Sequence, residues 1–370
     1  MRALGIILAG GKNEHLKELT RDRALGAMPV AGSYRAVDFA ISNMTNSGVN
    51  KVAVITQYNS RSLIEYLSSA KWWDFGRKHG GLFVFTPYMT FENSLWYRGT
   101  ADAIYQNLDY LKNSHEPYAI IAQGDGIVKI DYNKVLQHHI EKRADITIVC
   151  KEMPEGVDLS RFGVVSMNED QRVIEFEEKP IVPESNVVST GMYIIRRRLL
   201  IEMIEAIAHE QRHDLVNDII IRYRKQKKIY AYMFDGYWQS IADLDSYYET
   251  NMDFLRKDVR DSFLRQVPSI MSKVEDEPPA KFNYGSNVGN SLCSNGCIIN
   301  GEIHNSMLFR KVFVGRDTVI KNSIILNGSY IGDGCYIENA IIDSQSNIKN
   351  GTVINGTPEA LAIINDRSED

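Results

Sequence analysis

Short apolar runs alternate with longer amphipathic stretches from residue 3 to about residue 250. Five of the runs have the length and the β-branched content of buried strands: 3–9, 51–57, 118–124, 145–151 and 187–195. Five stretches repeat their apolar residues at helical spacing: 36–48, 61–70, 101–113, 133–142 and 197–209. The alternation predicts an α/β fold with a mostly parallel sheet, helices on both of its faces, and ligands beyond the carboxyl ends of the strands.

A different period begins after the polar, proline-containing segment 273–285. Three sets of apolar residues have a spacing of six within each set and an offset of 17 between sets: Leu308, Val314, Ile320; Ile325, Ile331, Ile337; and Ile342, Ile348, Ile354. Subtracting another 17 residues from the first set gives Ser291, Cys297 and Ile303. Steps of six, six and five describe a coil with three short sides, which is the hexapeptide pattern of a parallel β-helix. We expect about three and a half coils, capped by 357–365 or by another subunit.

The two periods predict two domains. We place the α/β domain at 1–255, a connecting segment and linker at 256–284, and the β-helix with its C-terminal cap at 285–370. A chain of 370 residues is longer than a single hydrophobic core usually serves, so two cores are expected.

The charge and the hydropathy of the chain exclude some classes of binding partner. The formal net charge is −5 and no long basic run occurs, which argues against nucleic acids and anionic membranes as partners. No apolar run approaches the roughly 20 residues that span a bilayer, and the N-terminus does not read as a signal peptide, so we expect a cytoplasmic protein. The four cysteines do not form a disulfide framework or a zinc pattern.

One histidine raises an alternative for the β-helix. Some acyltransferases built on hexapeptide repeats use a loop histidine as a general base. His304 is adjacent to Ile303 within a regular rung, so we interpret it as an outward-facing coil residue without a catalytic role.

An ordered series of motifs runs along nearly the whole chain. The series comprises IILAGG (6–11), YRAVDFAISNMTNSG (34–48), TQYNSRSL (56–63), WYRGTADAIYQN (96–107), GD (124–125), RFGVV (161–165), EFEEKP (175–180), GYW (236–238) and SYYETNMDFL (246–255). It resembles the ADP-glucose pyrophosphorylase (glucose-1-phosphate adenylyltransferase) family. The resemblance implies a Rossmann-like nucleotidyltransferase domain followed by a short left-handed β-helix. It also implies a reaction in glycogen biosynthesis in which ATP and glucose 1-phosphate give ADP-glucose and pyrophosphate with the help of Mg²⁺.

The resemblance assigns several residues to the sugar-phosphate side of such a site. Lys179 matches the lysine of the family's E-K-P motif, which contacts glucose 1-phosphate. Neighbouring sugar-side positions are matched by Glu178, Gly163 and Ser189, and Asp214 matches the aspartate of the family's H-D-F-G segment.

A second group of residues falls in segments that surround the nucleotide or relay effector binding in the family. The group comprises Gly10, Gly11, Arg35, Gln57, Trp96 and Gly99. Asp125 of the GD segment matches one of the family's two Mg²⁺ aspartates.

The chain departs from the family where the triphosphate and the metal would bind. The family's glycine-rich loop has a third glycine and an arginine where this chain has Asn13 and His15, and its R-A-K-P-A lysine is replaced by Leu25. The second metal aspartate aligns with Ser240, and an effector-side lysine aligns with Ser33. Leucine cannot contact pyrophosphate, and one carboxylate with one hydroxyl holds Mg²⁺ poorly.

These departures leave three hypotheses. The first is a regulatory companion of a catalytic ADP-glucose pyrophosphorylase subunit in a homo- or heterotetramer, with a degenerate triphosphate and Mg²⁺ site and with the capacity to bind glucose 1-phosphate or a phosphorylated effector. The second is an enzyme active alone, in which Lys12, His15 or Arg21 supplies the charge and Asp243 or Glu177 helps to hold the metal. The third is a sugar-phosphate sensor outside any such complex.

Overall fold

The computed structural model describes residues 2–75, 80–89 and 96–366. Contacts within the chain divide it into two compact units. The first comprises residues 1–12 and 39–238, and the second comprises residues 13–38 and 239–370. Helix α1 (Ala36–Asn46) and strand β13 (Trp238–Ser240) each cross a boundary between the units.

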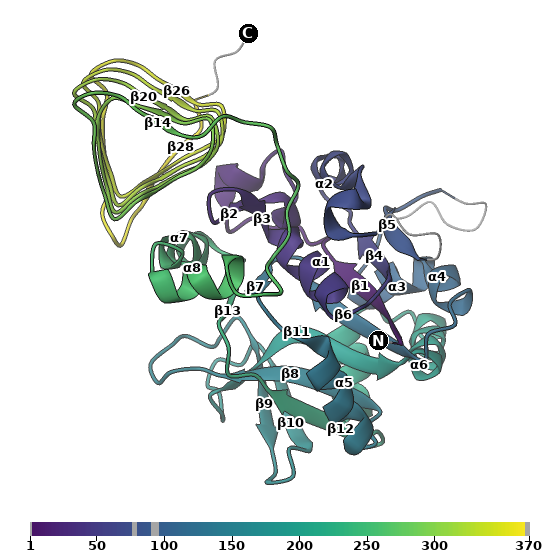
Figure 1. Ribbon diagram of the computed structural model, residues 1–370. Helices are drawn as coiled ribbons and strands as arrows, with labels where there is room; N and C mark the ends of the chain where they lie inside the picture. Colours follow the sequence, from purple (N-terminus) through teal and green to yellow (C-terminus); the bar gives the residue numbers. More distant parts are fainter. Residues whose placement is uncertain (1, 76–79, 90–95, 367–370) are drawn as a thin grey trace. The chain divides into compact units, whose positions relative to one another are not determined.

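The first unit contains a nine-stranded mixed sheet (Figure 1). Its central path is β10-β9-β11-β6-β1-β4-β5, and β8 joins it by pairing with β11 and with β12. The strands are β1 (Ala3–Leu8), β4 (Lys51–Ile55), β5 (Gly81–Phe85), β6 (Tyr118–Gln123), β8 (Ile146–Glu152), β9 (Gly163–Met167), β10 (Val173–Glu178), β11 (Val187–Arg196) and β12 (Ile229–Met233), with the short β7 (Gly126–Val128) outside this sheet. All five predicted strands are confirmed, as β1, β4, β6, β8 and β11.

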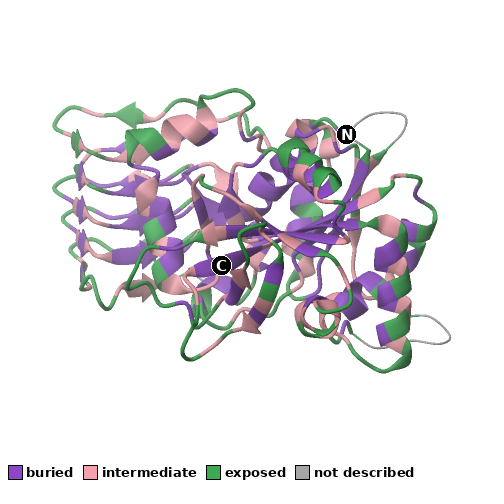
Figure 2. Cartoon of the chain, turned by 90° about the horizontal axis from the view of Figure 1, so that it is seen from below, coloured by how far each residue is buried: buried purple, intermediate pink, exposed green. Residues whose placement is uncertain are grey.

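The sheet combines a parallel part with antiparallel strands. Strands β6, β1, β4 and β5 run parallel, as predicted, whereas β11 runs antiparallel to β6, β8 and β9. The central strand β1 is buried along its whole length, as expected for a strand covered on both faces. Figure 2 shows strands in the middle of the molecule in the colour of buried residues.

The helices of the first unit lie close to the predicted ranges. They are α2 (Ser60–Leu67), α3 (Thr100–Gln106), α4 (Leu108–Lys112), α5 (Tyr132–Glu141) and α6 (Arg197–His209), with the 3₁₀ turn η3 (Ala70–Trp73) and the π turn η4 (Val216–Ile221). The predicted helix 101–113 is divided at Asn107, whose side-chain amide donates to Ala103 O at 2.8 Å and to the Tyr97 hydroxyl at 2.9 Å. Such a local side-chain bond competes with the helical ladder, so the break has a physical cause.

The second unit joins an N-terminal segment to the C-terminal half of the chain. The N-terminal segment holds η1 (Lys17–Thr20), η2 (Leu25–Ala27), β2 (Pro29–Val30) and β3 (Tyr34–Arg35), and the connecting segment holds α7 (Leu244–Asp253) and α8 (Lys257–Leu264). The Tyr247 hydroxyl donates to Pro29 O at 2.8 Å, and Asn251 Oδ1 accepts the amide of Ala31 at 3.0 Å. These bonds attach the N-terminal segment to α7.

The rest of the second unit is a parallel β-helix of three five-stranded sheets, which Figure 1 shows nearly end-on as a three-sided coil. The sheets are β14-β17-β20-β23-β26, β15-β18-β21-β24-β27 and β16-β19-β22-β25-β28. The strands are β14 (Lys281–Phe282), β15 (Asn287–Gly289), β16 (Leu292–Cys293), β17 (Ile298–Ile299), β18 (Glu302–His304), β19 (Met307–Leu308), β20 (Phe313–Val314), β21 (Val319–Lys321), β22 (Ile324–Ile325), β23 (Tyr330–Ile331), β24 (Tyr336–Glu338), β25 (Ala340–Ile342), β26 (Asn347–Ile348), β27 (Val353–Asn355) and β28 (Ala362–Ile364). The fold agrees with the left-handed β-helix that the motifs imply.

The 17-residue register is correct for the later coils. Leu308 pairs with Ile325 and Ile325 with Ile342, and the other two predicted columns stack in the same way. All nine of these side chains are buried, which makes them a continuous apolar core.

The register is wrong for two residues of the earlier coil. Leu308 pairs with Cys293 instead of Ser291, and Val314 pairs with Ile299 instead of Cys297. The corner between Ile299 and Ile303 is two residues shorter than the corner between Val314 and Ile320, so the coil returns after 15 residues. Gly301 lies in this tight corner, where a Cβ would lie 2.3 Å from Thr318 O.

The β-helix is also longer than predicted. Each of the three sheets has five strands, and the first strand of the β-helix, β14, begins at Lys281. The segment 357–365 contributes the last strand, β28, which pairs with β25. His304 flanks the buried Ile303 in β18, and its side chain is 39% exposed with Nε2 at 3.7 Å from Glu302 Oε2. Its position agrees with an outward-facing coil residue.

Candidate functional site

The loop after β1 has the open backbone of a ligand-binding turn. Leu8 and Gln123, the last residues of β1 and β6, are paired, so the segments that follow both strands start at the same edge of the sheet. Gly11 has no atom within 4 Å of the position that a Cβ would occupy. At Gly10 a Cβ would be in ordinary contact with Gln57, at 3.4 Å. The turn therefore leaves its backbone at Gly11 accessible to an anion.

Gln57 holds the segment that carries Trp96. The buried Gln57 side chain accepts the amide of Tyr97 at 2.8 Å and donates to Tyr97 O at 3.4 Å. Trp96 is 63% exposed and stacks on Tyr58, with ring centroids 6.3 Å apart. Tyr58 was not singled out from the sequence, because only the fold places it beside Trp96. An exposed aromatic pair of this kind can stack on a planar ligand.

Gly99 allows the chain to approach another segment closely. Its backbone is extended, and a Cβ would lie 2.4 Å from His213 O, which accepts the amide of Ala101 at 2.8 Å. The adjacent Thr100 hydroxyl donates to Asp214 Oδ2 at 3.3 Å, and Asp214 Oδ1 accepts the amide of Asn217 at 2.7 Å. Asp214 is thus held by two neighbouring segments of the first unit.

The residues assigned to the sugar-phosphate side come together around Glu178. Glu178 at the end of β10 pairs with Gly163, where a Cβ would clash with the Phe176 ring at 2.5 Å. Burial raises the pKa of Glu178, the Asp214 carboxylate raises it further, and the Lys179 ammonium lowers it. Glu178, Lys179 and Asp214 therefore act on one another electrostatically.

A bulge in β11 adds two hydroxyl groups to this neighbourhood. The pairing of β11 with β8 shifts between Ser189 and Met192, and Gly191 within the bulge has φ +73°. Buried Ser189 Oγ lies 3.3 Å from the Tyr193 hydroxyl. Burial raises the pKa of Tyr193, and Glu178 and Asp214 raise it further. No sequence signal marked Tyr193, because its role depends on the bulge.

Lys179 itself is exposed just after β10. Its φ of 53° is left-handed, and its amide donates to Phe162 O at 3.0 Å. Lys179 thus adds an exposed cationic side chain beside Glu178. The group formed by Gly163, Glu178, Lys179, Ser189, Tyr193 and Asp214 is called here the sugar-side cluster.

In the second unit, Asn13 has a structural use. Its Oδ1 accepts the amide of His15 at 2.9 Å, and its Nδ2 donates to Ala242 O at 2.8 Å. The first bond is an Asx turn that replaces the conformational freedom of a glycine with a fixed bend. His15 is exposed, whereas Leu25 lies half-buried in η2.

Ser33 lies against the first coils of the β-helix. Its hydroxyl donates to Ser294 Oγ at 3.4 Å, and its carbonyl accepts the Ser272 hydroxyl at 3.4 Å. Arg35 follows in β3, with its amide donating to Asp38 Oδ2 at 2.9 Å. Ser33 offers no positive charge to a phosphate.

The carboxylates that could hold a metal are few. Asp125 is half-buried in the turn between β6 and β7 of the first unit, and Ser240 in the second unit supplies only a hydroxyl. Asp243 is the N-cap of α7: its Oδ1 accepts the amide of Ser246 at 2.8 Å, within a capping box. Across residues 2–75, 80–89 and 96–366, no group of three or more His, Cys, Asp or Glu side chains is placed to hold a metal ion.

No helix in the described part of the chain is long and apolar enough to cross a membrane.

Comparison with known proteins identifies both halves of the chain. Residues 4–257 match the nucleotidyl transferase family, and residues 278–362 match the GlmU-like C-terminal hexapeptide family. A glucose-1-phosphate adenylyltransferase of Bacillus mycoides is 39% identical over 86% of this chain and 85% of its own. One of Geobacillus stearothermophilus is 37% identical over 86% of this chain and 83% of its own, and one of Bacillus thuringiensis is 39% identical over 86% and 85%.

Proposed function

The chain belongs to the nucleotidyl transferase family and, within it, to the glucose-1-phosphate adenylyltransferases, and we propose that it serves as a regulatory companion with little catalysis of its own. In this role it assembles in the cytoplasm with a catalytic subunit that makes ADP-glucose for glycogen synthesis. It contributes interfaces, and through them it changes the partner's affinity and rate.

The observation that carries this proposal is the capping box at Asp243. Asp243 is the nearest carboxylate in sequence to Ser240, and its Oδ1 is engaged by the amide of Ser246. Moving it to a metal would uncap α7, at a cost of about 1 kcal/mol. Asp125 and a serine hydroxyl are a poor donor set for Mg²⁺, which prefers carboxylates and water in octahedral geometry. The residues present therefore do not fit a resident magnesium ion.

The triphosphate side supports the same conclusion. Asn13 uses both ends of its side chain for protein contacts, and half-buried Leu25 stands where the family has a lysine. A single electrostatic contributor to a transition state is worth about 3 kcal/mol. Loss of three such groups, at the positions of His15, Leu25 and Ser240, would slow the chemical step by several powers of ten.

The sugar-side cluster supports binding of glucose 1-phosphate without turnover. Lys179 is exposed and cationic, and it adjoins Glu178 and Asp214, whose oxygens can accept hydrogen bonds from sugar hydroxyl groups. Glu178 would bind in this way whether ionised or protonated. Binding of glucose 1-phosphate to the sugar-side cluster would thus let this chain pass information on the ligand to the catalytic subunit.

The chief alternative is a chain that is active alone. Lys12, His15 and Arg21 follow β1 in the sequence, and all three side chains are exposed. Glu177 Oε2 is buried and has no hydrogen-bond partner among the described residues. Glu177 favours this alternative, whereas the capping role of Asp243 counts against it. A stand-alone sugar-phosphate sensor would use the same sugar-side cluster but would bind no catalytic subunit.

A mixed complex separates these functions. We would prepare the catalytic subunit with this chain as wild type and as Asp125→Ala, and measure ADP-glucose formation. The companion role predicts that Asp125→Ala leaves the activity of the complex unchanged within experimental error, whereas the same change at the equivalent aspartate of the catalytic subunit should abolish it. A loss of about half of the activity or more on Asp125→Ala would overturn the proposal, and failure to form a complex would favour the sensor.

A further inference from the structure

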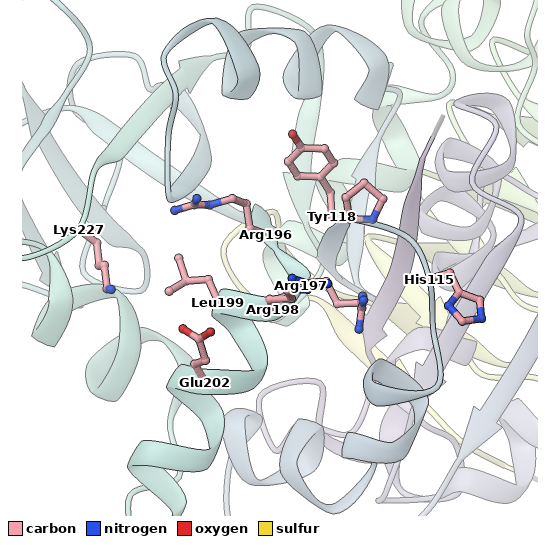
Figure 3. Close-up of a pocket in the computed structure, with 9 residues that line it drawn as sticks. His115, Tyr118, Arg196, Arg197, Arg198, Leu199, Glu202 and Lys227 are labelled. Carbon is pink, nitrogen blue, oxygen red and sulfur yellow. The ribbon is translucent and has the colours of Figure 1, made fainter.

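A cationic pocket lies in the first unit at the edge of the sheet opposite the sugar-side cluster. It has a volume of about 530 Å³ and is lined by residues from the segment before β6, from the junction of β11 with α6, and by Lys227 before β12 (Figure 3). A volume of this size is within the usual range for small-molecule sites.

The strand register fixes the location of the pocket. Arg196 pairs with Tyr118, the first residue of β6, while Gln123 at the other end of β6 is next to Gly124 and Asp125. Six residues of strand separate the two ends of β6 by about 17 Å. Along β11, Ser189 of the sugar-side cluster is about 20 Å from Arg196. The pocket is therefore distinct from the residues assigned to glucose 1-phosphate.

Two of its cations are held in place by the protein. Arg197 donates from Nε to Glu116 O at 2.7 Å and from Nη1 to Leu111 O at 2.9 Å, so its guanidinium forms a fixed wall. Arg196 forms an ion pair with Asp145, which largely neutralises its charge.

Two other cations have no such partner in the part of the chain that the structure describes. Arg198 and Lys227 line the same pocket, and neither side chain has a hydrogen bond or an ion pair with any described residue. Glu202 is the one carboxylate in the lining, one helical turn after Arg198. The lining is thus positive overall, with two cations available to a ligand and a hydrogen-bond acceptor beside them.

Neutral surfaces complete the pocket. Tyr118 and Leu199 contribute an aromatic and an aliphatic wall. No side chain caps α6 at this end, so the positive end of the helix dipole faces the same region as the arginines. The helix end adds to the cationic lining, which alone already selects an anion.

From the pocket, its unpaired cations and its single carboxylate, we infer a second binding site, whose ligand is a small phosphorylated polyol such as a sugar phosphate. Its phosphate binds between Arg198 and Lys227, and a hydroxyl of the ligand donates to Glu202. This site does not depend on whether the chain is catalytic, so its test is separate from that of the companion role.

Calorimetric titration of the full chain tests the site. Ribose 5-phosphate is the probe, and inorganic phosphate and ribose are the partial probes. We expect ribose 5-phosphate to bind most tightly, phosphate weakly and ribose not at all. We also expect the affinity to fall with rising salt, because the phosphate contacts are charge-charge interactions.

Single substitutions locate the site. Arg198→Ala and Lys227→Ala should each weaken binding of ribose 5-phosphate about ten-fold, since each removes a charge-assisted hydrogen bond. The matched control is Lys225→Ala, which removes an exposed lysine outside the lining and should leave the affinity unchanged. Lys179→Ala is a diagnostic of the other site, because any ribose 5-phosphate binding that it removes belongs to the sugar-side cluster.

Three results would overturn the inference. They are no binding of ribose 5-phosphate at millimolar concentration, binding that Arg198→Ala and Lys227→Ala leave intact, and binding that Lys179→Ala abolishes. If Arg198→Glu instead prevented association with the catalytic subunit while the wild-type chain bound no phosphate ester, the patch would be a protein interface.

Discussion

At the scale of single residues, the most informative positions are those whose side chains are engaged in the fold. Asn13 and Asp243 were selected from the sequence by comparison with a motif, and both have side chains bound to nearby backbone amides. The substitution at residue 13 was visible in the sequence, but its Asx turn was not. The sequence offered Asp243 as a residue that could help to hold the metal, and its capping box is a physical reason against that role.

Other residues could not be found from the sequence at all. Tyr193 joins the sugar-side cluster because of the bulge in β11, and Tyr58 joins the site because it stacks on Trp96. Both arrangements depend on the tertiary structure. The unpaired cations of the pocket depend on which nearby carboxylates the fold supplies.

A buried histidine gives a prediction at this scale. His139 is buried, and its Nδ1 lies 2.8 Å from Thr147 Oγ1. Burial, with a smaller contribution from Arg196, lowers its pKa from 6.5 to about 4. Above pH 6.5 the imidazole is neutral in both states and has no effect. As the pH falls from 6.5 towards 4, the unfolded state takes up the proton first, so stability is lost, by about 3 kcal/mol in total.

The variant His139→Gln should lose this pH dependence. We would measure the free energy of unfolding by urea denaturation between pH 7 and pH 4.5, with His209→Gln, an exposed position, as the control. Equal acid sensitivity of the wild type and His139→Gln would show that His139 does not titrate as described.

At the scale of elements, the sequence predicted regular structure well and its interruptions poorly. The six-residue spacing located the columns of the later coils because each column buries an aliphatic side chain. It failed at Ser291 and Cys297 because one corner is two residues shorter, so that a fixed spacing of six does not hold between Ile299 and Ile303. Likewise, 101–113 is divided at Asn107 by a side-chain hydrogen bond that periodicity cannot detect.

The attachment of the N-terminal segment to the β-helix gives a second prediction. Arg23 Nη2 lies 2.6 Å from Asp343 Oδ1, and the side chains are 13% and 0% exposed. Asp343→Asn would leave the arginine with no countercharge in a buried site, so we expect a loss of about 3 kcal/mol in the free energy of unfolding. Denaturation at neutral pH measures it.

The matched control removes a charge from an exposed pair of the same unit. Asp258→Asn breaks the ion pair between Asp258 and Arg256. The Arg256 side chain is 59% exposed and the Asp258 side chain 69%. Its effect should be less than about 1 kcal/mol. If the two variants differed by less than their experimental error, the buried pair would not stabilise the unit.

At the scale of the whole molecule, the fold class was predictable and the chemical competence was not. The alternation of strands and helices followed by a hexapeptide repeat predicts an α/β domain with a β-helix, and the series of motifs adds the resemblance to the nucleotidyl transferase family that the comparisons bear out. Activity depends on a few charges at specific positions, and 39% identity to glucose-1-phosphate adenylyltransferases is compatible with their presence or absence.

Assembly gives a prediction at this scale. Because a companion acts through interfaces, co-expression with a catalytic glucose-1-phosphate adenylyltransferase should give a complex that contains both chains. Light scattering of the purified complex would give its mass, and its turnover and affinity for substrates should differ from those of the catalytic subunit alone. Two species that elute separately at micromolar concentration would contradict the companion role.

The central claim concerns charge at the triphosphate and metal positions, and it is tested most directly by steady-state formation of ADP-glucose by this chain alone. With ATP, glucose 1-phosphate and Mg²⁺, we expect a rate at least about a thousand-fold below that of a catalytic relative. The triple variant His15→Arg, Leu25→Lys and Ser240→Asp should recover part of the difference. A lone wild-type chain that turned over as fast as the catalytic relative would contradict the account.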